Sequence, residues 1–238
     1  MVNNTRNVHT PSIRRLTRYL RFLRAAKTRG VTVVSCSRIA ESFNLSPVLV
    51  RRDLSFAGVL AAPKQGYRVN ELIEDIEQSL GWDHKTHALL VGAGNLGSAI
   101  VKYNGFREQG LNIAGIFDSD PNLHGTLING HKVFSFEKIV EYVKGLKSEY
   151  GISPDVGIIT VPADSAQEVA DKLIEVGVRA IWNYAPARLS LPENIVCESV
   201  SLCESFAILT HQLQMQDSGA TFKGHEFEFS LDPNSTIC

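Results

Sequence analysis

The residue pattern with the clearest chemistry is a glycine-rich turn between an apolar strand and a helix. The stretch HALLVGAGNLGSAIVKY runs from a strand at 88–91 into Gly92-x-Gly94-x-x-Gly97 and then into helical periodicity. Gly92 permits a tight turn, Gly94 lets the backbone approach a pyrophosphate, and Gly97 lets the helix pack on the strand. A pyrophosphate would lie at the helix N-terminus, where backbone amides and the helix dipole favour an anion. The pattern predicts a dinucleotide-binding turn.

An acidic residue follows at the distance expected for ribose recognition. Asp118 ends the next apolar segment, NIAGIFDSD, and lies 21 residues after Gly97. A carboxylate there accepts a hydrogen bond from the ribose 2′-hydroxyl and repels a 2′-phosphate, so we expect NAD(H) rather than NADP(H). Asp120 is the alternative acid, but it precedes Pro121 in a turn-like sequence, which favours a structural role.

Two later strands end in turns that could line the same ligand. The segments DVGIITVP and RAIWNYAP end in polar or proline-containing turns, and open parallel sheets bind ligands at the carboxyl ends of their strands. Val161, Pro162 and the segment from Asn183 to Pro186 are therefore candidates to contact the cofactor. The alternative is that these X-Pro turns only terminate their strands.

A second pattern with clear chemistry is basic and lies near the N-terminus. Residues 1–70 contain 13 Lys and Arg against two acidic residues, whereas residues 71–238 contain 11 Lys and Arg against 23 acidic residues. Such segregation of charge indicates two domains with different partners. Arg51 and Arg52 project together from one expected helix, and arginine can pair bidentately with guanine or clamp a phosphate. The alternative is an ordinary solvated basic face.

Three short helices are expected to position these arginines. The first starts at Thr10-Pro11 and has an apolar stripe, the second starts at Ser35 or Ser37, and the third starts at Ser46-Pro47. The tight connection at 44–45 predicts a helix-turn-helix whose second member lies in the major groove. The residues expected to face the core are Ile13, Leu16, Leu20 and Leu23 on the first helix and Val48, Leu49 and Leu54 on the third.

The segment AAPKQGYRV after the third helix contains turn residues and two further bases, which suits a β-hairpin wing along the phosphate backbone. The residues assigned to DNA contact are Ser46, Val48, Arg51, Arg52, Lys64 and Arg68. The Arg-rich amphipathic first helix would also suit a membrane surface or an acidic protein. The compact third helix argues against that alternative, because a peripheral membrane helix needs no such partner.

Other features argue against catalysis, metal binding and a membrane location. The four cysteines form no CxxC pair and have no zinc-ligand spacing, as expected for a reduced intracellular protein. No apolar run approaches the ~18 residues of a membrane span, and a signal peptide is not recognisable, so we expect a cytoplasmic protein. The scattered histidines lack suitably spaced acidic partners, and too little chain follows the last strand for a substrate domain. We therefore expect a bound ligand rather than an enzyme's cofactor.

These patterns predict an α/β fold with two main domains. An N-terminal winged-helix DNA-binding domain is expected over residues 1–81, with a connecting helix at 70–80. A C-terminal Rossmann domain, a doubly wound parallel sheet, is expected over residues 82–200. Residues 217–238 lack helical periodicity and are interpreted as a tail without an assigned function.

Over about residues 12–210 the chain resembles the family of the redox-sensing transcriptional repressor Rex. The matching segments occur in the family's order: RRLTRYLRFL, RRDLS, QGYRV, GAGNLG with Tyr103 downstream, FDSDP, TVPADSAQEVAD and NYAPARLSLPENI. The resemblance implies a homodimer whose C-terminal helix, here 201–216, is exchanged between subunits. It also implies binding to operator DNA when the NADH/NAD⁺ ratio is low and release when NADH rises. Two linked DNA-binding domains, one from each subunit, imply a palindromic operator.

The resemblance assigns roles residue by residue. Arg51 and Arg52 fall where the family contacts the operator, and Tyr103 falls where it places a tyrosine near the nicotinamide. Arg21 matches a first-helix arginine that pairs, in the NAD⁺-bound form of some members, with an aspartate just before the C-terminal helix. The residues assigned to the cofactor site are Gly92, Ala93, Gly94, Asn95, Leu96, Gly97, Asp118, Val161, Pro162, Asn183 and Pro186.

The chain departs from the family pattern where the Rossmann domain (the sensor, residues 82–200) is expected to signal to the DNA-binding domain (the head, residues 1–81). Ser201 and Leu202 stand in place of an aspartate and a phenylalanine, so neither the ion pair with Arg21 nor the interface ring can form. The wing segment AGVLAAPKQG also differs from the family's glycine- and phenylalanine-rich turn. Three alternatives follow: a small NAD-dependent oxidoreductase with a basic N-terminal extension, a Rossmann domain for another nucleotide such as coenzyme A, and a regulator with an altered redox response.

Overall fold

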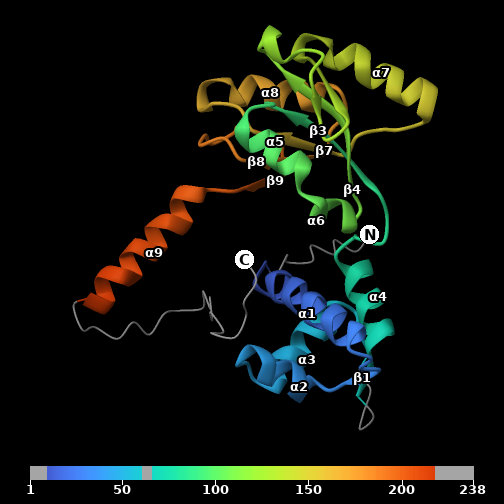
Figure 1. The fold of residues 1–238 in the computed structure, drawn as a ribbon, viewed down its shortest axis with the longest axis vertical. Coiled ribbons are helices and arrows are strands. Elements are labelled where there is room, and N and C mark those ends of the chain that lie inside the picture. Colours follow the sequence, from blue (N-terminus) through green and yellow to red (C-terminus); the bar gives the residue numbers. More distant parts are fainter. Residues whose placement is uncertain (1–9, 61–65, 218–238) are drawn as a thin grey trace. The chain divides into compact units, whose positions relative to one another are not determined.

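The computed structural model describes residues 10–60 and 66–217, which form two compact units divided between His84 and Lys85 (Figure 1). Each unit has its own hydrophobic core. One cluster of buried residues lies within the N-terminal unit, and two further clusters lie on the opposite faces of the sheet in the C-terminal unit. The two units are therefore described separately.

The N-terminal unit is a bundle of short helices with the predicted caps. The helices are α1 (Thr10–Thr28), α2 (Cys36–Phe43), α3 (Pro47–Phe56) and α4 (Val69–Ser79). The Ser35 hydroxyl accepts from the Arg38 amide at 3.1 Å, and the Ser46 hydroxyl accepts from the Leu49 amide at 3.2 Å. These bonds satisfy amides that the first turn of a helix leaves without partners. The predicted helix-turn-helix of α2 and α3 is confirmed.

The small sheet of this unit differs from the predicted hairpin. Strand β2 (Tyr67–Arg68) pairs antiparallel with β1 (Val33–Val34), which precedes α2 in the chain. Residues 57–60 are not in a strand, and residues 61–65, including Lys64, lie outside the described residues. Within the described residues, β2 therefore pairs with a strand that precedes α2 and α3 in the chain, and not with a strand adjacent to it in sequence.

A buried carboxylate joins α1 to α3. Asp53 is 0% exposed, and its two oxygens accept hydrogen bonds from Ser12, Arg15 and Tyr19 of α1. The surrounding core includes Leu16, Leu20 and Leu23, as predicted for the stripe of α1, whereas Ile13 is only half-buried. A buried charge is tolerated only when it is paired and fully hydrogen-bonded, and Asp53 meets both conditions.

The C-terminal unit is a doubly wound α/β fold. Its sheet has the order β5-β6-β4-β3-β7-β8-β9, in which all neighbours are parallel except β5 and β6. Leaving out β5, the chain order of the strands across the sheet is 3-2-1-4-5-6, the order of a Rossmann fold. The strands are β3 (Thr86–Val91), β4 (Leu111–Asp118), β5 (Leu127–Ile128), β6 (His131–Ser135), β7 (Val156–Ile159), β8 (Ala180–Asn183) and β9 (Val196–Ser199).

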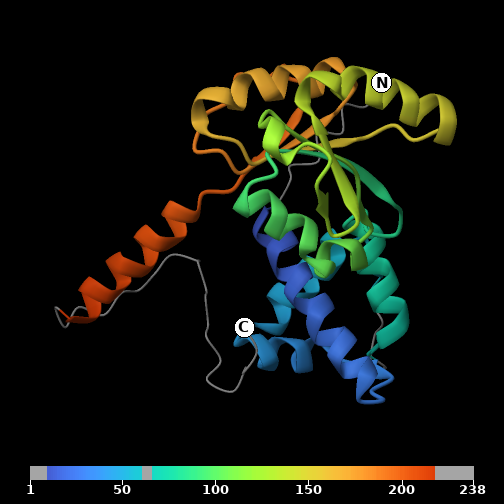
Figure 2. The ribbon, with the colours of Figure 1, turned by 45° about the horizontal axis from the view of Figure 1, so that its top comes forward.

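Helices cover both faces of this sheet, as Figures 1 and 2 show. The helices α5 (Asn95–Lys102) and α6 (Asn104–Glu108) pack on one face, and α7 (Ile139–Tyr150) and α8 (Ala163–Glu175) pack on the other. Strand residues alternate between the two cores: Ala88 and Leu90 face the first, and Leu89 and Val91 face the second. This two-faced burial explains why β3 reads as a continuous apolar run.

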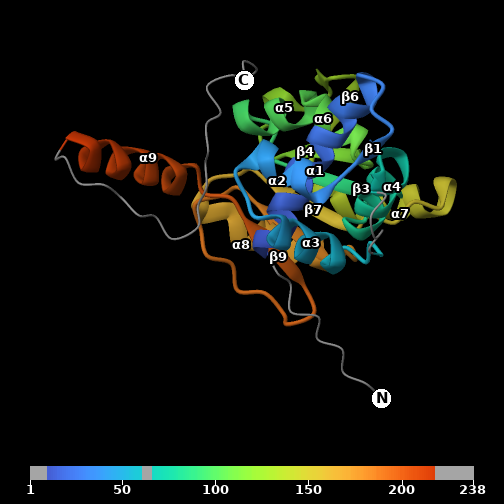
Figure 3. The same cartoon turned by 90° about the horizontal axis from the view of Figure 1, so that it is seen from below.

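The last helix, α9 (Leu202–Asp217), has no buried residue. Figure 3 shows it outside the two helical layers that cover the sheet. Ser201 caps its first turn, because its hydroxyl accepts from the Glu204 amide at 3.2 Å. No helix in the described part of the chain is long and apolar enough to cross a membrane.

The environment of Asp53 predicts a specific acid sensitivity. Burial raises the pKa of this carboxyl, but hydrogen bonds from Arg15, Ser12 and Tyr19 outweigh burial and hold the pKa below its ordinary value of 3.8. Because the folded pKa is the lower one, ionised Asp53 stabilises the fold above the unfolded pKa, and this contribution is lost as the pH falls through the folded pKa. We expect the free energy of unfolding to decrease less steeply between about pH 5 and pH 2 in Asp53→Asn than in the wild type.

Urea unfolding of the full chain, followed by circular dichroism at stepped pH, measures these slopes. Glu41→Gln is the matched control, because Glu41 is an exposed carboxylate of the same unit, paired only loosely with Arg38 at 3.6 Å. Equal slopes in the wild type and Asp53→Asn would contradict this description of the buried carboxylate.

Candidate dinucleotide site and DNA-binding helix

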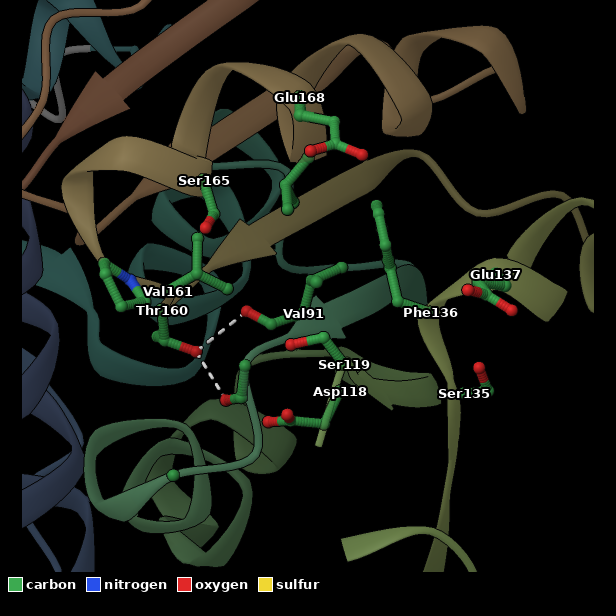
Figure 4. Close-up of a pocket in the computed structure, with 14 residues that line it drawn as sticks. Val91, Asp118, Ser119, Ser135, Phe136, Glu137, Thr160, Val161, Ser165 and Glu168 are labelled. Carbon is green, nitrogen blue, oxygen red and sulfur yellow. Dashed lines mark hydrogen bonds between the residues drawn. The ribbon is translucent and has the colours of Figure 1, made fainter. Parts of the chain in front are cut away.

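A cavity lies at the carboxyl ends of β3, β4 and β7, where the strand order of the sheet reverses (Figure 4). Its volume is about 370 Å³. In open α/β sheets this switch point is where ligands bind. The cavity is lined by Val91, Gly92, Gly94, Asp118, Ser119, Ser135, Phe136, Glu137, Thr160, Val161, Pro162, Ser165, Glu168 and Val169.

The glycine turn packs directly against Thr160. The Thr160 hydroxyl donates to the carbonyl oxygens of Val91 and Gly92, at 3.0 and 2.7 Å, and Figure 4 draws both bonds. Gly92 has φ 103°, and a Cβ atom there would lie 2.6 Å from the Thr160 carbonyl oxygen. A Cβ atom on Gly97 would lie 1.9 Å from the Gly92 carbonyl oxygen. Side chains at Gly92 and Gly97 are therefore excluded by the backbone itself.

Gly94 differs from the other two glycines of the motif. It caps α5, and a Cβ atom on it would meet no protein atom within 4 Å. The space beside it is open to the cavity, at the N-terminus of a helix whose first amides lack intrahelical partners. This arrangement suits a pyrophosphate that approaches the backbone closely. Ala93, Asn95 and Leu96 flank Gly94 in the same turn and the first turn of α5.

Asp118 is held in place by two backbone amides. One carboxylate oxygen accepts from the Ala93 amide at 2.6 Å, and the other accepts from the Asp120 amide at 2.8 Å. The carboxylate lines the cavity and has remaining acceptor capacity for a ribose hydroxyl. Asp120 accepts from the Asn122 amide and caps the short helix η1 (Pro121–Leu123), so it has the structural role that its sequence context favoured.

The charge of the cavity lining is negative. Asp118, Glu137 and Glu168 contribute carboxylates, and no Lys or Arg is among the residues that line it. A 2′-phosphate would meet this negative field without a basic partner, which favours a ligand that lacks one. Thr160 and Ser165 add hydroxyl groups on the β7 side.

Seven residues assigned to the cofactor are not among those that line this cavity. Four of them, Ala93, Asn95, Leu96 and Gly97, belong to the glycine turn and the first turn of α5, and the other three lie elsewhere. Asn183 is fully buried, where its side chain donates to the Ala187 carbonyl at 3.0 Å and accepts from the Ala185 amide at 3.0 Å. Pro186 is exposed in the same turn. Tyr103 is 60% exposed at the far end of α5, with its ring 4.8 Å from that of Phe106. Within one chain the structure therefore brings Gly92, Gly94, Asp118, Val161 and Pro162 together at the cavity, whereas Asn183, Pro186 and Tyr103 lie away from it.

Helix α3 presents its two arginines to solvent. Arg51 and Arg52 are exposed, and their neighbours Val50, Asp53 and Leu54 form the buried face. The prediction that Val48 faces the core is wrong, because its side chain is 71% exposed. The run Val48-Leu49-Val50 offers more than one apolar face, and the packing selects Val50. The core role of Asp53 had no signal in the apolar pattern.

The other residues assigned to DNA contact and signalling are mostly at the surface. Arg68 is exposed on β2 and pairs with Glu71 at 3.3 Å. Burial and a hydrogen bond with Cys36 raise the pKa of the Tyr67 phenol on β2, and the charge of Arg51 lowers it by a smaller amount. Arg21 on α1 and Leu202 at the start of α9 are exposed, and Ser201 serves as the helix cap described above.

Two families match parts of the chain that coincide with the two units. The family described as "Putative DNA-binding protein N-terminus" matches residues 7–55, and the family described as "CoA binding domain" matches residues 83–187. Among curated proteins, the redox-sensing transcriptional repressor Rex of Treponema denticola is 37% identical over 84% of this chain and 92% of that protein. The protein of the same name in Desulfitobacterium hafniense is 39% identical over 87% of this chain and 95% of that protein.

Solved structures agree with these relatives. The crystal structure of RSP in complex with β-NAD⁺ and operator DNA has a TM-score of 0.81 and 32% identity, and it covers 89% of this chain and 95% of RSP. The structure of RSP in complex with β-NADH has a TM-score of 0.76 and covers 90% of this chain and 97% of RSP. Both similarities span an N-terminal helical unit and a C-terminal parallel sheet.

The packing of the glycine turn predicts different outcomes for two alanine substitutions. Gly97→Ala forces the turn apart, so we expect a lower melting temperature and a loss of NADH affinity of about tenfold or more. Gly94→Ala meets no protein atom, so its melting temperature should equal that of the wild type. Its added methyl group occupies the approach of the pyrophosphate, so NADH affinity should still fall.

Thermal unfolding and titration of NADH fluorescence measure the two effects on the same samples. Unchanged NADH affinity in Gly94→Ala would contradict the position of the pyrophosphate. Unchanged stability in Gly97→Ala would contradict the packing of the turn.

Proposed function

Because the chain belongs to the Rex family of redox-sensing transcriptional repressors, we propose that it represses transcription by binding operator DNA under the control of NAD(H). The observation that carries this function is that one chain contains both a capped helix-turn-helix with exposed arginines and a glycine-turn cavity lined by the carboxylate of Asp118. NAD(H) acts as a regulatory ligand, and the protein is a regulator rather than an enzyme.

The N-terminal unit is the DNA-binding part. In this proposal α3 enters the major groove, where Arg51 and Arg52 contact bases or phosphates. Ser46, Val48 and Arg68 are exposed around the same helix and β2, and they add contacts to the DNA surface. Lys64 is assigned to the backbone contact of the wing from the sequence alone.

The C-terminal unit is the sensor. The adenosine half of the ligand would occupy the cavity beside Asp118, with the pyrophosphate at Gly94 and the first turn of α5. Tyr103 and Pro186 are exposed outside that cavity, so we assign them to contact with the nicotinamide half or with the ligand of the second subunit. The buried Asn183 supports the turn that carries Pro186 through its bonds to Ala185 and Ala187. The ligand does not need to react, because its binding alone can shift an equilibrium between two arrangements of the DNA-binding units.

Helix α9 is proposed to join two copies of the chain. Its large apolar residues Leu202, Phe206, Leu209 and Leu213 recur at intervals of four, three and four residues, and each is 57–66% exposed. Such a stripe on a helix requires a partner surface. A second copy, into which α9 is exchanged, supplies that surface and places two heads on a palindromic operator. A dimeric repressor of this kind acts in the cytoplasm.

A gel shift on a palindromic operator tests the function. We expect binding by the protein alone or with NAD⁺, and release when NADH is added at equal concentration. In Arg51→Ala, operator binding should weaken by ~1–3 kcal/mol while NADH affinity stays the same. Equal operator affinity with NAD⁺ and NADH would contradict redox control. Unchanged operator affinity in Arg51→Ala would contradict the role of α3.

The dimer is tested by placing a charge in the apolar stripe of α9. Leu209→Asp should convert the dimer to a monomer in sedimentation experiments, because an unpaired carboxylate in a buried interface costs several kcal/mol (about 3–5). Gln214→Glu is the control on the same helix, and it should remain dimeric. A dimer in Leu209→Asp would exclude this stripe from the interface.

A further inference from the structure

The buried carboxylate of Asp53 lies between α1 and the helix that bears the two exposed arginines. Asp53 directly follows Arg51 and Arg52 in the chain, yet it is on the buried face of α3 together with Val50 and Leu54. An apolar pair of similar volume could stabilise the core as well as this buried ion pair does, so stability alone does not account for a charge beside a binding helix.

The carboxylate is held by a row of donors on one face of α1. Ser12, Arg15 and Tyr19 are separated by three and four residues, which places them one above another along the helix. One oxygen of Asp53 accepts from the Ser12 hydroxyl at 2.7 Å and from a terminal Arg15 nitrogen at 2.8 Å. The other accepts from Arg15 Nε at 2.7 Å and from the Tyr19 hydroxyl at 2.8 Å. Both oxygens are therefore fixed in direction as well as in position.

The apolar residues of α3 define its rotation only loosely. Val50 and Leu54 are fully buried, but Val48 and Phe56 are also apolar and are 71% and 43% exposed, and a shift of one residue turns the helix by about 100°. Apolar burial is non-directional, whereas the fork of an arginine on a carboxylate has one geometry. The bonds to Asp53 favour the observed rotation, in which Val50 is buried and Val48 is exposed.

We propose that Asp53 is a positioning residue that fixes the rotation of α3, and thereby the direction in which Arg51 and Arg52 meet the operator. This inference rests on the proposed function, because it concerns how well the chain distinguishes its operator from other DNA. Hydrogen bonds to base edges require a set direction, whereas attraction to phosphates tolerates a rotated helix. Loss of the carboxylate should therefore reduce operator preference more than general DNA affinity.

The experiment measures operator and random-sequence DNA affinity of full-length variants by fluorescence anisotropy, together with NADH affinity and melting temperature. The main variant is Arg15→Met combined with Asp53→Leu, which replaces the buried pair by apolar residues and so retains burial. Asp53→Asn and Tyr19→Phe are the partial variants, of which Tyr19→Phe removes one hydrogen bond and keeps the ring. Glu41→Gln is the control for the loss of one carboxylate from the same unit.

We expect the ratio of operator to random-sequence affinity to fall about tenfold or more in the double variant and in Asp53→Asn, and about threefold in Tyr19→Phe. Random-sequence affinity and NADH affinity should stay within about twofold of the wild type, since the phosphate contacts and the cavity are unaltered. Glu41→Gln should retain the wild-type ratio.

Two results would overturn the proposal. One is an unchanged ratio in any folded variant, including Tyr19→Phe. The other is a parallel loss of operator affinity, random-sequence affinity and melting temperature, which would make Asp53 a stabilising residue only. If the wild type and Glu41→Gln themselves lack operator preference, the proposed function fails instead, whatever Asp53 does.

Discussion

The contact between the glycine turn and Thr160 is the constraint on which the ligand site depends. It joins β3 to β7 at the reversal of strand order, with the Thr160 hydroxyl 2.7 Å from the Gly92 carbonyl oxygen. Such an approach is possible only because Gly92 and Gly97 lack side chains. The hydrogen bond from Ala93 to Asp118 then ties β4 to the same turn, so three strand ends together define the cavity.

The two units use the same physical principle for different ends. In each, apolar packing provides the stability, and a few directional polar contacts determine which groups face a partner. In the C-terminal unit such contacts hold the glycine turn and Asp118 at the cavity. In the N-terminal unit, we propose, the bonds to Asp53 set the direction of the two exposed arginines. Because the groups proposed to face DNA and NAD(H) belong to separate units, the ligand can act on DNA binding only through a different affinity for two arrangements of the protein.

Much of this architecture could be predicted from the sequence, and the exceptions share a cause. Strong local signals indicated the capped helices and the glycine turn, because each depends on neighbours in the chain, and a characteristic spacing from that turn indicated Asp118. The pairing of β1 with β2, the donors of Asp53 and the place of Thr160 depend on residues 33 or more positions apart. Val48 was misplaced because three consecutive apolar residues do not define one helix face, and Ser201 gained a meaning, as a helix cap, only once α9 was seen.

The central claim is that dinucleotide binding and operator binding are coupled, and such coupling must be reciprocal. The most direct test is therefore the affinity for NADH measured in the absence and in the presence of saturating operator DNA. The account predicts that operator DNA weakens NADH binding, by the same factor by which NADH weakens operator binding. An NADH affinity that is the same with and without operator DNA would contradict it, even if both ligands bind tightly.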